Sequence, residues 1–192
     1  MREIGRIVRL QVQAGSLKRG ERPKRVYDPA ALIEVPRLRL SPRGAASELE
    51  GRPLLDVHHA DHPRTKAEPG REASFGFTSH YGKMRGEYGD HLAVGCAGEN
   101  VLIETDRLWR LEDFGGGLAF RSRESGALLR LSCVSVADPC VEFSRYALRA
   151  PEAPPQELKP VLQFLGEGTR GYVFTPESDG VVAVGDALVI LG

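Results

Sequence analysis

The last segment of the chain, residues 171–191, limits the possible folds more than any other stretch. Three short β-type runs, Gly171–Thr175, Val181–Val184 and Ala187–Leu191, are separated by Pro-Glu-Ser-Asp-Gly and by Gly-Asp. Both separators are turn sequences, because proline presets φ while glycine and aspartate accept the backbone angles of tight turns. The spacing predicts a meander of three strands, and we expect this meander to close the sheet.

Short apolar runs and turn residues alternate through the rest of the sequence as well. Ile4–Val12 alternates apolar with polar side chains closely enough to predict a first strand. Ala31–Leu40 is a second extended piece, in which Pro36 requires an edge or a bulge because it has no N–H to donate. Ser41–Pro53 shows no periodicity and is predicted as a loop. Further strands are expected at Val101–Ile103, Leu118–Arg121 and Ala127–Val136.

Helical signals are few and short. Phe77–Tyr88 places apolar residues three and four positions apart, which predicts a helix. Tyr146–Pro155 is a proline-rich connection, and Gln156–Leu165 predicts another helix. Pro160 is expected near the start of that helix, because an interior proline costs about 3 kcal/mol. Thr105–Phe114 predicts a helical turn whose apolar side chains lie on the core, namely Leu108, Trp109 and Leu111.

Length and composition agree with a turn-rich β fold. The chain has 192 residues, of which 41% are hydrophobic and 27% charged, and its 22 glycines and 13 prolines are spread out. A chain of this length buries roughly 70% of the surface that its unfolded form exposes, so a real core is available. The sequence predicts a single domain over residues 1–192, mostly β, folded as a closed or nearly closed β-barrel with a few short helices.

The charge balance argues against some classes of partner. Lys and Arg number 26 and Asp and Glu number 26, so the formal net charge is zero. A neutral chain without interleaved basic and aromatic residues does not predict binding to nucleic acid or to an acidic membrane. The charge is uneven, because residues 1–45 hold 11 basic and 4 acidic side chains while residues 151–192 hold 2 and 6. The basic excess forms either an anion-attracting face or a solvated strand surface.

The cysteine content and the N-terminal sequence indicate the cellular compartment in which we expect the protein. Three cysteines are an odd number in a chain of ordinary domain size, which does not predict a disulfide framework. The N-terminal sequence MREIGRIVRLQV lacks the apolar region of a secretory signal, and no apolar run reaches the roughly 18 residues that span a bilayer. We therefore expect a cytoplasmic protein without a membrane segment.

Cys140 is the strongest candidate for chemistry. The apolar run Leu129–Val136 predicts a buried strand, and the Asp-Pro pair that follows ends it abruptly, so Cys140 is expected on a strand-end loop. A thiolate there can act as a nucleophile or bind a soft metal. A free cysteine more often packs as a small hydrophobe, so this segment alone leaves both roles open. Cys133, inside the run, is predicted to be inert core, and Cys96 to be secondary.

A histidine-rich stretch is a second candidate site. Asp56–His62, with the sequence DVHHADH, holds three of the five histidines. Imidazoles and carboxylates are ligands for zinc or iron. The spacing is not HExxH, and the basic residues that follow oppose a cation, so a polar loop near a site is the alternative to a metal site. Other enzyme signatures are absent, including GxSxG, the phosphate-binding GxxxxGKS loop and paired CxxC motifs.

Three segments taken in order resemble one known family. They are GCAGENVLIE at Gly95–Glu104, ADPC at Ala137–Cys140, and GTRGYVFTPESDGVVAVGDALVIL at Gly168–Leu191. Together with GRIVRLQV at Gly5–Val12 they resemble the MOSC domain, which is found at the C-terminus of molybdenum cofactor sulfurases. The resemblance covers most of the chain and rests on the ordered set of motifs. The His-Gly-Gly form that is usual in the family's histidine-containing loop is absent.

The resemblance implies a mostly β barrel that binds the pyranopterin molybdenum cofactor or handles its terminal sulfur. It places the family's cysteine at Cys140, as the catalytic thiol, persulfide carrier or ligand to molybdenum. Arg170 becomes the natural partner for a phosphate, because guanidinium offers a planar fork, whereas an exposed surface arginine is the alternative. The cofactor-binding residues expected on this basis are Glu99, Asn100, Thr169, Arg170 and His59.

Two classes of function remain open at this point. One is a molybdenum cofactor-dependent oxidoreductase or sulfur-transfer protein that acts through Cys140, with a redox or sulfur-donor protein as its partner. The other is a binding or carrier module that holds the cofactor without turnover. A family member that has lost its ligand is a further option, because the His-Gly-Gly form is missing.

Overall fold

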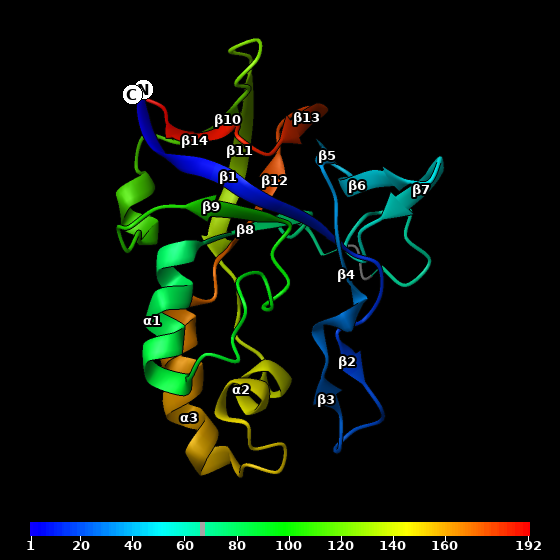
Figure 1. The fold of residues 1–192 in the computed structure, drawn as a ribbon, viewed down its shortest axis with the longest axis vertical. Coiled ribbons are helices and arrows are strands. Elements are labelled where there is room, and N and C mark those ends of the chain that lie inside the picture. The colour runs from blue at the N-terminus through cyan, green and yellow to red at the C-terminus, as the bar shows by residue number, and fades with distance from the viewer. Residues whose placement is uncertain (66–67) are drawn as a thin grey trace.

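The structure is a computed structural model that describes residues 1–65 and 68–192. Its main element is a sheet of seven strands in the order β14-β10-β11-β12-β8-β9-β1, which closes because β1 also pairs with β14 (Figure 1). Neighbouring strands are antiparallel, except that β8 and β9 run parallel. The barrel strands are β1 (Arg2–Gln13), β8 (Ala73–Phe77), β9 (Val101–Glu104), β10 (Leu118–Arg121), β11 (Leu128–Val136), β12 (Tyr172–Pro176) and β14 (Ala187–Ile190).

Smaller sheets flank the barrel. A four-stranded sheet has the order β13-β5-β6-β7, a short hairpin joins β2 to β3, and β4 pairs with the end of β1. These strands are β2 (Lys18–Arg19), β3 (Val26–Tyr27), β4 (Leu32–Glu34), β5 (Arg37–Ser41), β6 (Gly44–Leu49), β7 (Arg52–Leu55) and β13 (Gly180–Ala183). The break between β4 and β5 falls at Pro36, as expected for a residue that cannot donate to a ladder.

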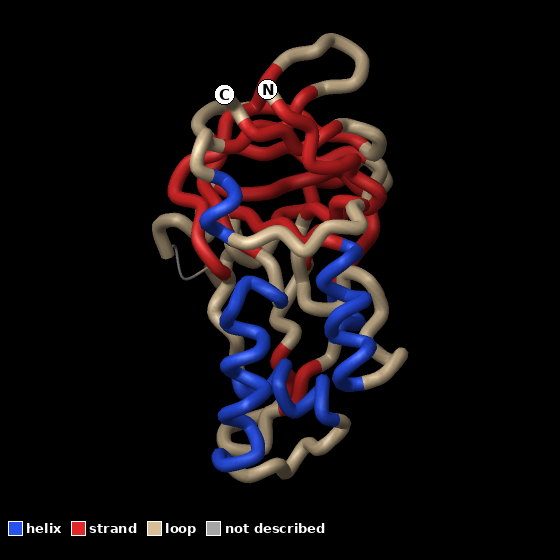
Figure 2. Tube along the Cα trace, turned by 90° about the vertical axis from the view of Figure 1, so that its left-hand side faces the viewer, coloured by secondary structure: helices blue, strands red, loops and turns tan. Residues whose placement is uncertain are grey.

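Three helices lie together at one end of the barrel (Figure 2). They are α1 (Thr78–Tyr88), α2 (Val141–Leu148) and α3 (Pro155–Phe164), and a single π-type turn, Leu165–Thr169, continues α3 toward β12. Short 3₁₀ turns occur at Pro29–Ala31 and Leu111–Phe114. The helices share an apolar cluster that includes Tyr81, Met84 and Phe143, each fully buried. This cluster is separate from the core of the barrel and supports the region where the candidate site lies.

Aromatic rings fill the barrel itself. Phe75 and Phe77 from β8 and Tyr172 and Phe174 from β12 are all fully buried, because alternate residues of a strand point to the same face. The Phe75 and Tyr172 rings stack with centroids 5.2 Å apart. Each such side chain contributes roughly 1.5–3 kcal/mol through burial, so these strands hold much of the stability of the fold. The prediction of a mostly β closed barrel with short helices is confirmed.

The predicted C-terminal meander is wrong, although its last strand does close the barrel. β12 pairs with β11 and β8, β13 pairs with β5, and β14 pairs with β1 and β10. The three strands therefore enter two different sheets instead of pairing with each other. Turn sequences fix where strands end, but the partner of each strand is decided by which distant apolar face it covers.

The loop predicted at residues 41–53 is also wrong, because it contains β6 and the first half of β7. Gly44 and Ala45 are buried, but the rest of β6 is progressively exposed, so the apolar alternation that identifies a strand is missing. Pro53 is tolerated in β7 because β7 is the edge strand of its sheet. Gly44 has φ of +121°, and a Cβ there would lie 2.6 Å from the Cα of His59, which explains the glycine.

Cys133 is exposed, so its prediction as inert core is wrong. The register between β11 and β12 shifts between Ser132 and Ser135, and Cys133 in this irregularity has φ of +53°. The shift turns the side chain away from the barrel. Two other core predictions are wrong as well, because Leu108 and Leu111 are exposed while Trp109 between them is buried.

The helical lobe departs from the sequence prediction at two points. α2 occupies the beginning of the segment predicted as a proline-rich connection, and it starts directly after Cys140. α3 starts at Pro155, so Pro160 lies inside the helix and not near its start. Among the described residues, no helix is long and apolar enough to cross a membrane.

Candidate functional site

Cys140 lies at the start of a helix. β11 ends at Val136, and after the Asp-Pro pair the chain enters α2, for which Cys140 is the N-cap. The Cys140 sulfur accepts a hydrogen bond from the Phe143 N–H at 3.5 Å. The side chain is partly buried. The sulfur is thus held at the helix end whose unpaired N–H groups favour negative charge.

Arg170 reaches the same helix from the segment before β12. Its guanidinium donates to the carbonyl oxygen of Asp138 and, at 3.5 Å, to that of Ala97. Its Cζ atom lies 5.6 Å from the centroid of the Phe143 ring. Arg170 therefore contacts the segment leading to Cys140 and the first turn of α2, so the structure brings these two predicted site residues into one neighbourhood.

The charge of Arg170 is not neutralised by an ion pair within the described part of the chain. Both hydrogen-bond partners of its guanidinium are uncharged carbonyls, since the Asp138 carboxylate pairs instead with Arg71. The Arg170 Nε atom is buried and has no hydrogen-bond partner among residues 1–65 and 68–192. This arrangement leaves a positive group beside the Cys140 helix for an anionic ligand.

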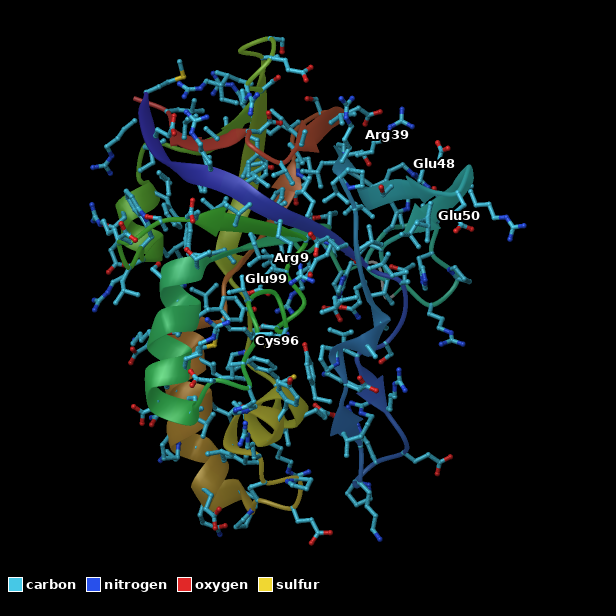
Figure 3. The ribbon with its side chains drawn as sticks, viewed as in Figure 1. Arg9, Arg39, Glu48, Glu50, Cys96 and Glu99 are labelled. Atoms are coloured by element: carbon cyan, nitrogen blue, oxygen red, sulfur yellow. The ribbon has the colours of Figure 1, made fainter. Side chains whose placement is uncertain are left out.

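Two tyrosines hold the loop at residues 95–100 against this site. Figure 3 labels Cys96 and Glu99 of this loop. The Tyr27 hydroxyl donates to the carbonyl of Cys96 at 2.8 Å, and the Tyr81 hydroxyl accepts from the Ala97 N–H at 3.0 Å. The Tyr27 ring meets the Phe143 ring edge-on, with centroids 5.0 Å apart. Burial raises the Tyr27 pKa well above its usual value, although Arg170 opposes this. Sequence reasoning missed Tyr27, because the contact spans 69 positions and no motif marks it.

Cys96 is a buried thiol of the same loop. Burial, assisted by the nearby Glu99 carboxyl, raises the pKa of Cys96 to about 12. Only the thiolate is nucleophilic or binds metal, so burial disfavours the reactive form of Cys96. The three cysteines therefore occupy different settings: Cys96 is buried, Cys133 is exposed, and Cys140 is partly buried at a helix end.

Glu99 lies in a space made by two glycines. A Cβ at Gly76 would come within 2.6 Å of a Glu99 carboxyl oxygen, and one at Gly171 within 3.3 Å of its Cγ. The Tyr81 hydroxyl contacts the two carboxyl oxygens at 2.9 and 2.8 Å. Burial raises the Glu99 pKa to about 7, against the opposing effect of hydrogen bonds and of Arg170. Glu99 therefore fills the space beside these glycines, and its carboxyl is turned inward to Tyr81.

Glu99 is expected to make stability depend on pH. Its pKa is about 7 in the folded protein and 4.5 ordinarily, so the folded state binds the proton more tightly. Such a group stabilises the protein below about pH 4.5, and this contribution is lost as the pH rises through 7. At about 1.36 kcal/mol per pH unit, the free energy of unfolding should fall by roughly 3 kcal/mol across this interval.

Urea denaturation of the wild type and of Glu99→Gln at pH 5 and pH 8 measures this contribution. Between pH 5 and pH 8 the free energy of unfolding of the wild type should fall by roughly 2.5 kcal/mol more than that of Glu99→Gln, because part of the interval lies below pH 5. Glu104→Gln, on the exposed last residue of β9, is the matched control and should behave as the wild type. His80 acts in the opposite sense, because burial lowers its pKa to about 4, so only the difference between variants is diagnostic. Equal pH dependence in all three proteins would contradict a buried ionising Glu99.

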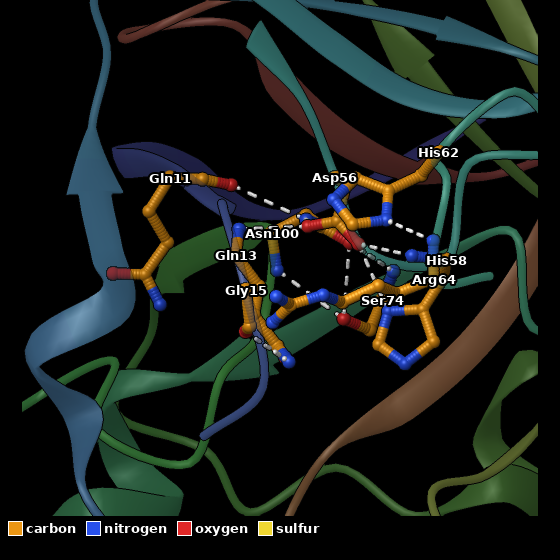
Figure 4. Close-up of polar contacts among 9 residues, drawn as sticks. All are labelled: Gln11, Gln13, Gly15, Asp56, His58, His62, Arg64, Ser74 and Asn100. Carbon is orange, nitrogen blue, oxygen red and sulfur yellow. Dashed lines mark hydrogen bonds and ion pairs between the residues drawn. The ribbon is translucent and has the colours of Figure 1, made fainter. Parts of the chain in front are cut away.

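Asn100 is fully engaged by the protein (Figure 4). Its amide nitrogen donates to a carboxyl oxygen of Asp56 at 2.7 Å and to the carbonyl of Gln11 at 3.2 Å. Its amide oxygen accepts from the Ser74 N–H at 3.0 Å. Asp56 in turn accepts from the Gln13 N–H at 2.8 Å. The network joins β1, β8 and the residue before β9 to the histidine-rich loop.

The histidines of that loop point to different partners. His58 bonds to Asp56 through Nδ1 at 2.9 Å, while the buried His59 accepts from the Asp61 N–H at 3.1 Å. Burial lowers the His59 pKa, although Asp61 opposes this. His62 accepts from the Arg64 N–H at 3.1 Å. Among the described residues, no group of three His, Cys, Asp or Glu side chains could hold a metal ion.

Thr169 lies next to Arg170 but is turned toward α1. It is buried, and its hydroxyl lies 3.5 Å from the Lys83 amino group. Gly168 beside it has φ of +88°, and a Cβ there would lie 2.5 Å from the Tyr172 hydroxyl. Both the backbone angle and the lack of room for a side chain therefore require glycine at this position. The structure thus brings Cys140, Arg170 and Glu99 into one region. Asn100 belongs to the adjoining polar network, and the His59 ring contacts Asp61 within the histidine-rich loop.

Comparison with known proteins agrees with this architecture at the level of fold. No family model matches the sequence, and no curated protein matches it. Solved structures do match, and they support a MOSC-like β-barrel fold. The YuaD protein of Bacillus subtilis superposes with a TM-score of 0.59 at 15% identity, over 96% of this chain and 93% of that one.

Two further structures give the same result. A hypothetical protein superposes with a TM-score of 0.58 at 16% identity, over 99% of this chain and 68% of its own. YiiM of Escherichia coli superposes with a TM-score of 0.54 at 17% identity, over 97% of this chain and 70% of its own. At these identities the likeness concerns the fold alone, so function is argued from the site.

Proposed function

We propose that this protein binds the molybdenum cofactor and acts in sulfur transfer or in cofactor-dependent reduction through Cys140. The observation that carries the proposal is the placement of the Cys140 sulfur at the N-cap of α2 beside the unpaired charge of Arg170. A thiol at a helix N-terminus near an arginine is a typical setting for reactive or metal-binding cysteines.

The residues present suit such a cofactor. Sulfur is a soft ligand of the kind that thiophilic metals prefer, and Cys140 offers it on a partly exposed side chain. Arg170 offers a guanidinium with an orphaned, buried Nε and no carboxylate partner in the described chain, which suits a phosphate. When bound, the cofactor would supply a molybdenum centre for two-electron chemistry or a terminal sulfur.

The chain's own groups would hold and orient the ligand. The Phe143 N–H holds the Cys140 sulfur at the helix end, and the Asp138 and Ala97 carbonyls hold the guanidinium of Arg170. Tyr27 and Tyr81 fix the loop that carries the Ala97 carbonyl. The partly exposed Cys140 thiolate would take the outer sulfur of a persulfide on a sulfur-donor protein, and the donor's own cysteine thiolate would leave.

A carrier without turnover is the second candidate, and one observation favours it. Glu99 and Asn100 have their polar groups engaged inside the protein, so neither offers a free acid or base to a substrate. A site made of a thiol and an arginine can retain a cofactor without those groups. Assays of N-hydroxylated substrates with the loaded protein separate the candidates, since a carrier should show bound molybdenum but no turnover.

The affinity of Arg170 variants tests the anion site. Arg170→Lys keeps the charge but loses the bidentate fork, so calorimetry should show about tenfold weaker binding of the phosphate-bearing cofactor, equal to about 1.4 kcal/mol. A pterin that lacks the phosphate should bind both proteins equally. Arg39→Lys, on the exposed side of β5, is the matched control and should change neither affinity (Figure 3). If Arg170→Lys weakened the binding of both ligands equally, Arg170 would not contact the phosphate and would only support the loop at residues 95–100.

A further inference from the structure

A second pocket lies along α2, on the side that faces β3. Its volume is about 330 Å³, within the usual range for small-molecule sites. Val26, Tyr27, Tyr146 and Pro151 supply its apolar and aromatic walls. Neither Cys140 nor Arg170 lines it, so binding there goes beyond the proposed function.

The aromatic wall is held in place by ring contacts. The Tyr146 ring lies 5.4 Å from Tyr27, 6.1 Å from Phe143 in a stacked arrangement, and 5.6 Å from His91 in an edge-on arrangement. The Tyr27 hydroxyl is directed away to the Cys96 carbonyl, so its ring and not its oxygen forms the wall. Such a surface suits a planar ring, which can stack on tyrosine faces or meet their edges.

The charges around this wall leave a positive excess. Glu142 lines the pocket as a carboxylate, because hydrogen bonds from Arg25 and the charge of Lys18 lower its pKa to about 2 although burial opposes this. Arg25 bonds to Glu142 at 2.7 Å and so balances it. Within the described part of the chain, Arg145 donates only to the uncharged carbonyl of Ala153, at 3.2 and 3.3 Å.

Arg149 is the remaining charged group of the pocket. It is exposed, ends α2 with φ of +53°, and pairs with no carboxylate among residues 1–65 and 68–192. Arg145 and Arg149 therefore present two uncompensated guanidinium groups next to two tyrosine rings. A ligand with an aromatic ring and one carboxylate would contact both the tyrosine rings and the guanidinium groups, because guanidinium binds carboxylates in a planar fork.

We propose that this pocket binds small planar aromatic carboxylates, with the ring against Tyr27 and Tyr146 and the carboxylate on Arg145 and Arg149. Because α2 also carries Cys140 at its other end, such a ligand would lie along the same helix as the candidate thiol. Occupancy requires no cofactor, which makes the pocket testable in protein purified without molybdenum.

Ligand-observed NMR and calorimetry with 2-naphthoate test the pocket. The purified chain should bind this probe saturably with a Kd of about 1 mM or tighter. The neutral 2-naphthylmethanol and the ringless acetate should each bind at least about tenfold more weakly, because each lacks one of the two recognised features. No saturable binding of 2-naphthoate, or equal binding of the neutral analogue, would overturn the proposal.

Variants locate the binding to the pocket. Arg149→Gln should weaken 2-naphthoate about tenfold, equal to about 1.4 kcal/mol, and Tyr146→Ala should weaken it at least as much. Arg39→Gln removes the same charge from β5 and should leave the affinity unchanged. Arg170→Lys should also leave it unchanged, which separates this pocket from the cofactor site. If Arg149→Gln and Arg39→Gln weakened 2-naphthoate binding equally, the attraction would be non-specific. If Arg149→Gln left the affinity unchanged, Arg149 would not be the carboxylate partner. This second test holds even if Tyr146→Ala fails to fold.

Discussion

Removal of residues 181–192 is expected to prevent the chain from folding. The deletion takes away β14, which pairs with both β1 and β10, and therefore opens the barrel and exposes two strand edges. It also removes the buried Ala187 and four larger buried apolar side chains, Val182, Leu188, Val189 and Ile190. At roughly 1.5–3 kcal/mol each, their burial is worth about 6–12 kcal/mol, whereas most domains have only about 5–15 kcal/mol of stability.

Circular dichroism and thermal melting of the truncated chain measure this effect. The expected result is loss of the cooperative transition, with the protein recovered mainly as aggregate. A soluble truncated protein that melts near the temperature of the full chain would show that β14 does not hold the barrel closed.

A pair of single substitutions provides a matched control for the truncation. Leu188→Ala removes a fully buried side chain of β14 and should cost about 2–5 kcal/mol. Val184→Ala changes a half-exposed side chain in the turn before β14 and should change the free energy of unfolding by less than about 0.5 kcal/mol. Equal effects of the two substitutions would contradict the packing of β14 in the barrel.

The role of β14 also shows which parts of the fold could be predicted from sequence. The apolar run at residues 187–191 identifies a strand buried on both faces, because every residue of β14 is buried. Its neighbours could not be predicted, because β1 lies at the opposite end of the sequence and no local pattern specifies that pairing. Sequence reasoning therefore predicted the barrel and its closure but not the strand order.

The errors near the site have local physical causes. α2 was missed because its N-cap is Cys140, which is not one of the usual capping residues, and because VEFSRYAL contains β-type residues. Cys133 was misplaced because a positive φ is uncommon outside glycine and asparagine, so a register shift at a cysteine has no sequence signal.

The candidate site was predictable only in part, because much of it depends on contacts between distant segments. Cys140 and Arg170 were chosen from motifs, and the structure places them around Phe143. The inward orientation of Glu99 depends on space left by Gly76 and Gly171, which lie far from it in sequence. This space forms only when β8 packs against the segments that precede β9 and β12.

Substitution of Cys140 by serine is expected to abolish bound molybdenum and any persulfide while the fold remains intact. Serine is a favoured N-cap, and its hydroxyl can accept the Phe143 N–H that the Cys140 sulfur accepts in the wild type. The free energy of unfolding should therefore change by less than about 1 kcal/mol. Serine lacks the soft, polarisable sulfur, so it can neither carry a persulfide nor bind molybdenum as a thiolate does.

The other two cysteines are the matched controls for this experiment. Cys133→Ser changes an exposed side chain and should retain full cofactor occupancy and full stability. Cys96→Ser changes a buried side chain, so it is expected to lower the melting temperature but to retain occupancy in the protein that folds. Metal analysis and mass spectrometry, on protein from a host that makes the cofactor, give the molybdenum content and the mass of each cysteine-containing peptide. Full molybdenum occupancy in Cys140→Ser, or equal loss in Cys133→Ser, would remove Cys140 from the site, because neither result is compatible with a unique sulfur ligand at the start of α2.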